Sequence, residues 1–328
     1  MEQKKIKRIG VLTSGGDSPG MNAAVRAVAR TAIRYGIECI GIRRGWQGLI
    51  NSDFVKLSVD MTRHILNRGG TILYTARSEE FMTEKGREKA VATCKMLGLD
   101  GVVAIGGDGT FRGALELSRL GVAVMGIPAT IDNDIGCSNY TIGFDSACNT
   151  AIDCIDKLRD TMQSHERCSV VEVMGRHAGF LALYVGLAVG ATSVLVPERE
   201  LDFQKDVVEL IQSARLAGAT HFMVVVAEGA GNAIEIGERV HNELGLDPRV
   251  TVLGHIQRGG APTARDRETA TRMGYYAVKA FAEGRTGSVI GTREGGIVET
   301  PIEEALAMVK HLQMDRYEIL EAISSVGH

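Results

Sequence analysis

The sequence predicts an α/β protein with two domains, each built on a mostly parallel β-sheet between two layers of helices. Short apolar runs alternate with longer helical patterns, in the βαβ rhythm of a doubly wound fold, and this rhythm occurs twice. The apolar runs are nearly continuous, as expected for parallel strands that are covered on both faces. The chain has 328 residues, which corresponds to about two domains.

The strand signal occurs in seven segments rich in β-branched residues, with helical patterns between them. The predicted strands are 8–12, 39–42, 101–105, 123–127, 169–174, 222–226 and 250–253. The predicted helices are 21–35, 85–97, 111–120, 147–161, 203–217 and 263–282. Residues 177–197 carry no formally charged side chain, and we interpret them as a buried helix followed by a buried strand at 193–196 rather than as a membrane span.

The composition excludes several classes of protein. Hydrophobic residues make up 45% of the chain and charged residues 23%, with a formal net charge of −3, which excludes intrinsic disorder and provides no basic field for nucleic acid. The six cysteines form no CxxC pair, so we expect reduced thiols in a cytoplasmic protein. The apolar run after the basic N-terminus is too short for a signal peptide, and we expect neither a nucleic-acid nor a membrane partner.

Two glycine-rich turns follow predicted strands, at the sheet edge where α/β proteins bind their ligands. Residues 13–22 (TSGGDSPGMN) and 106–110 (GGDGT) each lead into a helix, whose N-terminal N–H groups can bind phosphate. Asp108 can hold a Mg²⁺ ion on that phosphate. The alternative for 13–22 is a tight turn without a ligand. The chain contains neither GxxxxGK[ST] nor GxGxxG at these turns.

Three further strand ends carry polar groups. Asp132 and Asp134 in the turn 128–134 are typical of proton transfer and metal binding; a solvated Asx turn is the alternative. Arg176 follows the strand 169–174 and suits a phosphoryl group, although it could form a surface ion pair. His255, in 254–260 (GHIQRGG), suits a phosphate monoester, but taken alone it could be a core histidine. Five such strand ends together favour phosphoryl transfer to a hydroxyl of a second phosphorylated metabolite.

These motifs, in this order, resemble the bacterial 6-phosphofructokinase family. The residues that carry the resemblance are GGD at 15–17, GGDG at 106–109, TIDND at 130–134, MGR at 174–176 and GHIQRGG at 254–260, and it extends from residue 6 to about 309. It implies two Rossmann-like three-layer α/β/α domains with the active site in the cleft between them. The larger, nucleotide-binding domain would be 1–143 with 256–306, and the smaller, sugar-phosphate-binding domain 144–255 with 307–328. The tail 310–328 matches no motif.

The resemblance also implies the role of each site residue. Asp132 is the expected base for the 1-hydroxyl of fructose 6-phosphate, with Thr130 and Arg176 stabilising the γ-phosphoryl group; all three also contact the substrate. ATP and Mg²⁺ would be bound by Gly16, Arg77, Ser78, Gly107, Asp108, Gly109 and Thr110, with Asp108 on the metal. The sugar phosphate would be bound by Met174, Glu228, His255 and Arg258, with Arg167 and Arg249 from a neighbouring subunit. We therefore expect a homotetramer with shared active sites.

Two departures from the family concern the donor and the regulation. Pyrophosphate-using relatives tend to have an acidic residue at the position of Gly109 and a lysine at the position of Ala129. Because both residues are small in this chain, ATP is the favoured donor. Ala129 nevertheless departs from the glycine that ATP-using members usually have there. Arg26, Arg30 and Arg159 match part of the family's effector site. At other positions where the family has basic residues, this chain has Val59, Ala217, Ala219 and Thr220, and where the family has an acidic metal ligand it has Thr192. We expect a weak response to ADP and phosphoenolpyruvate. Alternatively, Arg26 and Arg30 are structural.

Three other functions stay open at this point. A pyrophosphate-dependent phosphofructokinase would share the fold, and an NAD kinase-like enzyme would use 106–110 alone. A non-catalytic sugar-phosphate sensor is the third, but a sensor has no need of a base such as Asp132 or of Arg176.

Overall fold

The computed structural model describes residues 6–324, which pack as two units. The first unit contains residues 6–130, with Asp134–Ser146 and Arg258–Lys310. The second contains Ile131–Asn133, Ala147–Gln257 and residues 311–324. Each unit has its own sheet, so the prediction of an α/β protein with two mostly parallel sheets is confirmed.

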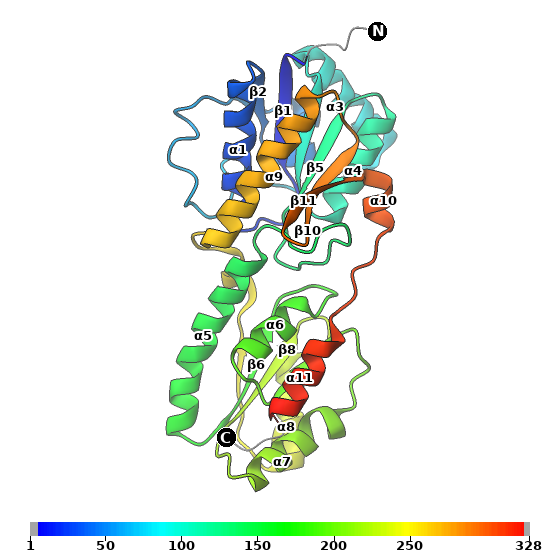
Figure 1. Ribbon diagram of the computed structural model, residues 1–328. Helices are drawn as coiled ribbons and strands as arrows, with labels where there is room; N and C mark the ends of the chain where they lie inside the picture. The colour runs from blue at the N-terminus through cyan, green and yellow to red at the C-terminus, as the bar shows by residue number, and fades with distance from the viewer. Residues whose placement is uncertain (1–5, 325–328) are drawn as a thin grey trace. The chain divides into compact units, whose positions relative to one another are not determined.

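The sheet of the first unit has the strand order β11-β10-β5-β4-β1-β2-β3 (Figure 1). The five inner strands are parallel, and the edge strands β3 and β11 are antiparallel to their neighbours. The strands are β1 Arg8–Thr13, β2 Glu38–Ile42, β3 Phe54–Lys56, β4 Gly101–Gly106, β5 Val124–Pro128, β10 Ser288–Arg293 and β11 Gly296–Pro301. The carboxyl ends of β1, β4 and β5 are therefore neighbours.

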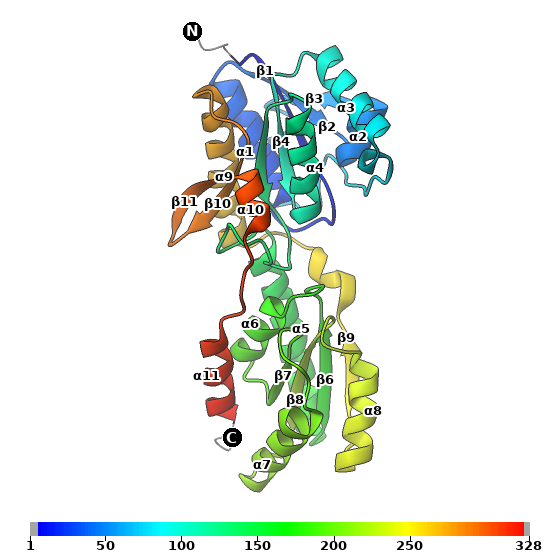
Figure 2. The ribbon, with the colours of Figure 1, turned by 90° about the vertical axis from the view of Figure 1, so that its right-hand side faces the viewer.

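Helices cover both faces of this sheet (Figure 2). One face packs against α1 (Met21–Arg34) and α9 (Ala264–Ala282), and the other against α2 (Gly45–Asn51), α3 (Glu84–Leu97), α4 (Asp108–Arg119) and α10 (Ile302–Ala307). Gly274 lets α9 approach α1 closely, because a Cβ at this position would lie 2.6 Å from that of Ala27. A 3₁₀ helix, η1 (Glu80–Met82), precedes α3.

The sheet of the second unit is entirely parallel, with the order β7-β8-β6-β9. Its strands are β6 Cys168–Val173, β7 Ser193–Leu195, β8 Phe222–Ala227 and β9 Arg249–Val252. A π-helix (Gln204–Glu209), α7 (Leu210–Leu216) and α8 (Ala233–Leu244) pack on one face. On the other side lie α5 (Phe144–Ser164), α6 (Phe180–Ala188) and α11 (Met314–Ser324) (Figure 2). The 3₁₀ helix η3 (Gly254–Arg258) follows β9.

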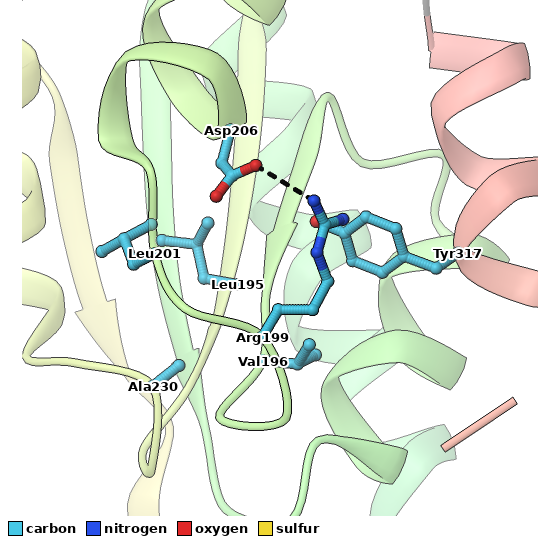
Figure 3. A pocket seen from close by; sticks show the side chains of 7 residues that line it. All are labelled: Leu195, Val196, Arg199, Leu201, Asp206, Ala230 and Tyr317. Carbon is cyan, nitrogen blue, oxygen red and sulfur yellow. Dashed lines mark ion pairs between the residues drawn. The ribbon is translucent and has the colours of Figure 1, made fainter. Parts of the chain in front are cut away.

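The C-terminal tail, for which the sequence provided no assignment, forms α11 and packs against β7 and α6. The hydroxyl of Tyr317 donates to the carbonyl of Val194 (3.0 Å). Figure 3 shows Arg199 between Tyr317 and Asp206: its guanidinium carbon lies 4.2 Å from the ring centroid and its Nη2 3.5 Å from Asp206 Oδ1. These contacts fix the tail helix on the second unit.

Every predicted strand and helix is present, with ends shifted by a few residues. Two of the observed helices differ from the prediction at their N-terminal ends. The helix predicted at 111–120 begins at Asp108, so the acidic residue of GGDGT lies in its first turn. The helix predicted at 203–217 begins as a π-helix and continues as α7. The elements that were not predicted are β3, β10, β11, α2, α8, α10 and α11.

The uncharged segment 177–197 forms α6 followed by β7, which confirms its interpretation as a buried helix and strand. In the described part of the chain no helix is long and apolar enough to cross a bilayer.

The cysteines are all free, and five of the six are buried. Burial raises the pKa of the Cys39, Cys94 and Cys168 thiols to about 12 and that of Cys137 to about 11, so these side chains hold almost no reactive thiolate at neutral pH. Because only Cys154 is partly accessible, we expect a colorimetric disulfide reagent to titrate one thiol per native chain rapidly and all six after unfolding in urea. Rapid reaction of several thiols in the native protein would contradict this packing.

Candidate active site

The two glycine-rich turns of the first unit are hydrogen-bonded to each other. The backbone N–H of Ser14 donates to the carbonyl of Ile105 (3.0 Å), and the hydroxyl of Thr110 donates to the carbonyl of Ser14 (3.0 Å). Gly106 lies where they meet: a Cβ there would lie 2.3 Å from Thr110 Oγ1 and 2.4 Å from the Ser14 carbonyl oxygen. The predicted phosphate-binding turns therefore form one continuous surface.

The second of these turns opens α4. Gly107 is its N-cap residue and has no side chain to cap the first N–H groups, and Asp108 lies in the first turn. Such N–H groups, at the positive end of the helix dipole, are suited to an anion. No heavy atom of the described residues would lie within 4 Å of a Cβ added to Gly109, so the space in front of this turn is open. The arrangement fits the predicted ATP-phosphate contacts at 107–110.

The loop that carries Arg77 and Ser78 lies against the first glycine turn. Thr75 Oγ1 donates to the carbonyl of Gly15 (2.7 Å). Ser78 is also structural, because its hydroxyl donates to Gln47 Oε1 (2.6 Å) and accepts from the N–H of Phe81 in η1 (3.2 Å). Arg77 is exposed. Thr75 was not predicted, since nothing in its local sequence indicates a contact with Gly15.

Arg258, from the GHIQRGG segment, also reaches the first turn. Its Nη1 donates to the carbonyl of Asp17 (3.1 Å) and lies 2.6 Å from the position of a Cβ on Gly16. Glycine at position 16 therefore leaves room for the guanidinium group against the turn. A contact between residues 241 positions apart in the sequence thus places the guanidinium group of Arg258 beside the first glycine turn.

The acidic turn follows β5, next to the glycine turn of β4. The N–H of Ala129 donates to the carbonyl of Gly106 (3.0 Å), and the carbonyl of Thr130 accepts from Thr141 Oγ1 (2.7 Å). Asp132 is only 7% exposed, which argues against the alternative of a solvated Asx turn. Asn133 has a left-handed backbone conformation (φ 53°), which asparagine adopts more readily than most residues other than glycine.

In the second unit, a carboxylate holds the MGR turn in place. Glu228 Oε1 accepts from the N–H groups of Gly175 (3.2 Å) and Arg176 (2.6 Å). Gly175 (φ 143°) and Arg176 (φ 59°) both have positive φ, so these hydrogen bonds stabilise an unusual turn. The Arg176 side chain is exposed and is available to an anion; no ion pair to it is found among the described residues.

Gln257 connects the MGR turn to η3. It is fully buried, and its Oε1 accepts from the N–H of Met174 (2.9 Å). Sequence reasoning quoted Gln257 within its motif but assigned it no role. His255, two residues before it, is exposed, so the alternative of a core histidine is wrong.

The sequence is similar to known proteins over almost its whole length. The family model "Phosphofructokinase" matches residues 8–281. The chain belongs to the phosphofructokinase family. A curated relative from Shouchella clausii, named ATP-dependent 6-phosphofructokinase, is 50% identical over 319 residues, which cover 97% of this chain and 100% of the relative. The predicted family is confirmed.

Solved structures of phosphofructokinases have the same fold. The Saccharomyces cerevisiae structure matches 98% of the chain with a TM-score of 0.86 and 32% identity, and the Pichia pastoris structure matches 98% with a TM-score of 0.88 and 36% identity. The chain spans less than half of these two yeast chains, 46% and 37% of their lengths.

Arg167 and Arg249, which the resemblance assigned to the sugar-phosphate site, lie at the amino ends of the strands of the second sheet. Arg176 lies at the carboxyl ends of these strands. Arg167 precedes β6 and Arg249 begins β9, where it pairs in register with Ser169. Arg176 follows the other end of β6, and a strand of six residues is about 20 Å long. Within one chain, Arg167 and Arg249 are therefore far from Arg176. The exposed Arg249 forms an ion pair with Asp247 (3.0 Å).

The residues matched to the family's effector site were Arg26, Arg30 and Arg159. Arg30 Nε donates to Thr62 Oγ1 (3.3 Å) and its Nη2 to the carbonyl of Val59 (3.4 Å), while Arg159 donates to the carbonyl of Val189. Burial and then the charge of Arg30 lower the pKa of Arg26, whose buried Nε has no hydrogen-bond partner among the described residues. Arg30 thus has structural contacts, and the effector role stays a prediction.

Proposed function

We propose that this chain is an ATP-dependent 6-phosphofructokinase of cytoplasmic glycolysis, which transfers the γ-phosphoryl group of MgATP to the 1-hydroxyl of fructose 6-phosphate. The observation that carries the proposal is the sheet edge of the first unit, where the two joined glycine turns lie next to the acidic turn. The acidic turn continues the chain directly from β5 and carries the carboxylate of Asp132. Phosphate-binding turns combined with such a carboxylate are suited to phosphoryl transfer. The names of the curated relatives support the same reaction.

In this reaction Asp132 accepts the proton of the 1-hydroxyl group while the oxygen of that hydroxyl attacks the γ-phosphorus of ATP. The bond between the γ-phosphorus and the β,γ-bridging oxygen breaks, and ADP leaves with its electron pair. Thr130 and Arg176 stabilise the charge on the transferred group. MgATP is bound by Gly16, Arg77, Ser78, Gly107, Asp108, Gly109 and Thr110, and the sugar phosphate by Met174, Glu228, His255 and Arg258. Glu228 acts in part through the backbone of the MGR turn, which it holds.

The magnesium ion would be held by Asp108 and the phosphates. Among the residues that the structure describes, no three acidic, histidine or cysteine side chains gather into a metal site. This fits Mg²⁺, which proteins commonly bind through one or two carboxylates plus substrate phosphates. When bound, the ion neutralises part of the phosphate charge.

The donor is ATP rather than pyrophosphate. The open space at Gly109 supports nucleotide binding. Ala129, the departure from the usual glycine, is 1% exposed and packs in the core with residues of α1 and α9. Its methyl group therefore fills the core and takes no space from a nucleotide.

The active form is a homotetramer in which Arg167 and Arg249 contact the sugar phosphate of a neighbouring copy. Their position at the opposite sheet edge from Arg176 supports this sharing, because one chain cannot bring all three to the same phosphorylated sugar. Six free cysteines are consistent with a reducing compartment.

The test is to incubate the purified protein with Mg²⁺ and fructose 6-phosphate, add ATP or pyrophosphate in parallel, and measure fructose 1,6-bisphosphate. We expect product with ATP only. Product with pyrophosphate only would assign the chain to the other donor class. Binding of fructose 6-phosphate without product from either donor would favour a sensor, and phosphorylation of NAD instead would favour an NAD kinase-like enzyme.

A further inference from the structure

The segment 308–310, here called the strap, lies against the loop 134–139 that follows the acidic turn. Gly136 makes this approach possible, since a Cβ at this position would lie 2.3 Å from the carbonyl oxygen of Met308. The Lys310 ammonium group donates to the carbonyls of Ser138 (2.9 Å) and Asn139 (3.1 Å). The strap therefore holds the loop through both backbone packing and a charged side chain.

The opposite side of the loop is fixed by β10. The N–H of Thr292 donates to Ser138 Oγ (3.0 Å), and the N–H of Asn139 donates to the carbonyl of Thr292 (2.7 Å). The first unit therefore fixes the chain on both sides of residues 131–133: the hydroxyl of Thr141 donates to the carbonyl of Thr130, and β10 with the strap holds the loop 134–139.

The charge of Lys310 is placed beside the acidic turn. Burial lowers the pKa of Lys310 to about 8, and the negative charge of Asp134 opposes this shift. Asp134 is the second carboxylate of the turn, two residues after Asp132. A half-buried ammonium group costs desolvation free energy that an apolar side chain of similar length would avoid. The lysine therefore needs a reason other than packing.

We propose that Lys310 is a positioning residue for phosphoryl transfer: it fixes the loop after the acidic turn and offsets the charge of Asp134, and so keeps Asp132 in place to accept the proton. This inference rests on the proposed phosphofructokinase activity. Lys310 contacts backbone carbonyls rather than a substrate, so its loss should lower kcat with little change in KM.

The test compares Lys310→Met, which removes the charge and the donors, with Lys310→Arg, which keeps both. We expect Lys310→Met to lower kcat by about 10–100-fold, as for a slightly misplaced catalytic group, with KM for ATP and fructose 6-phosphate changed less than about threefold because neither site loses a contact. Lys310→Arg should recover most of the lost kcat. Lys205→Met removes an exposed, ion-paired lysine and serves as the control.

Thermal unfolding of each variant separates misplacement from misfolding. A Lys310→Met protein that keeps wild-type kcat would overturn the inference, and so would equal losses of kcat in the Met and Arg variants. A wild-type chain that forms no fructose 1,6-bisphosphate would instead refute the proposed function, so the two failures can be told apart.

Discussion

Replacing Asp132 by asparagine is expected to lower kcat for fructose 1,6-bisphosphate formation by about 10²–10⁴-fold, the usual contribution of a general base. The amide has nearly the same size and shape as the carboxylate, so it fits the same buried position, but it cannot accept the proton of the 1-hydroxyl group. The KM for fructose 6-phosphate should change little, because a base at the reacting hydroxyl acts mainly in the transition state. Steady-state kinetics at saturating ATP measures both constants.

The matched control is Asp153→Asn, which removes an exposed carboxylate of α5 that pairs with Lys157. This variant should keep wild-type kinetics, because surface ion pairs contribute little. If Asp132→Asn loses kcat and sugar-phosphate binding in parallel, or unfolds at a much lower temperature, the carboxylate serves structure and another group must be the base.

The strand-end motifs could be located from the sequence because their signal is local. The strands β1, β4 and β5 of the first sheet are runs of mostly apolar residues, and burial on both faces by α1, α9, α3 and α4 explains why these runs are continuous. The polar residues directly after such a run must lie at the carboxyl edge of the sheet. The positions of the two glycine turns and of the acidic turn follow from this rule alone.

Other parts depend on contacts between distant segments, which no local period encodes. Strand β11 is half-exposed at the sheet edge, so it lacks the continuous apolar run of an inner strand. Helix α8 is different, because the sequence does indicate both of its ends, with Asn232 as the N-cap and Gly245 after the C-terminus. The helix was nevertheless not predicted. The contact of Arg258 with Asp17 and that of Lys310 with Ser138 arise only once the chain has folded.

Substituting Gly109 by aspartate is expected to abolish most ATP-dependent activity while leaving the fold intact. The new side chain would enter open space, and Gly109 has no positive φ that would strain it. A carboxylate in the first turn of α4 also interacts favourably with the helix dipole, worth about 0.3–1 kcal/mol. The melting temperature should therefore stay the same or rise slightly.

The same carboxylate would oppose the phosphates of ATP. Two like charges about 4 Å apart repel by about 4 kcal/mol near a protein surface, which corresponds to a loss of about 10²–10³-fold in kcat/KM for ATP once screening is allowed for. Gly109→Ala adds a Cβ without charge and should retain most of the activity, so the pair of variants separates charge from volume. An unchanged kcat/KM for ATP in Gly109→Asp would mean that the nucleotide phosphates do not bind at the N-terminus of α4, and the donor site would have to be sought elsewhere along the edge formed by β1 and β4.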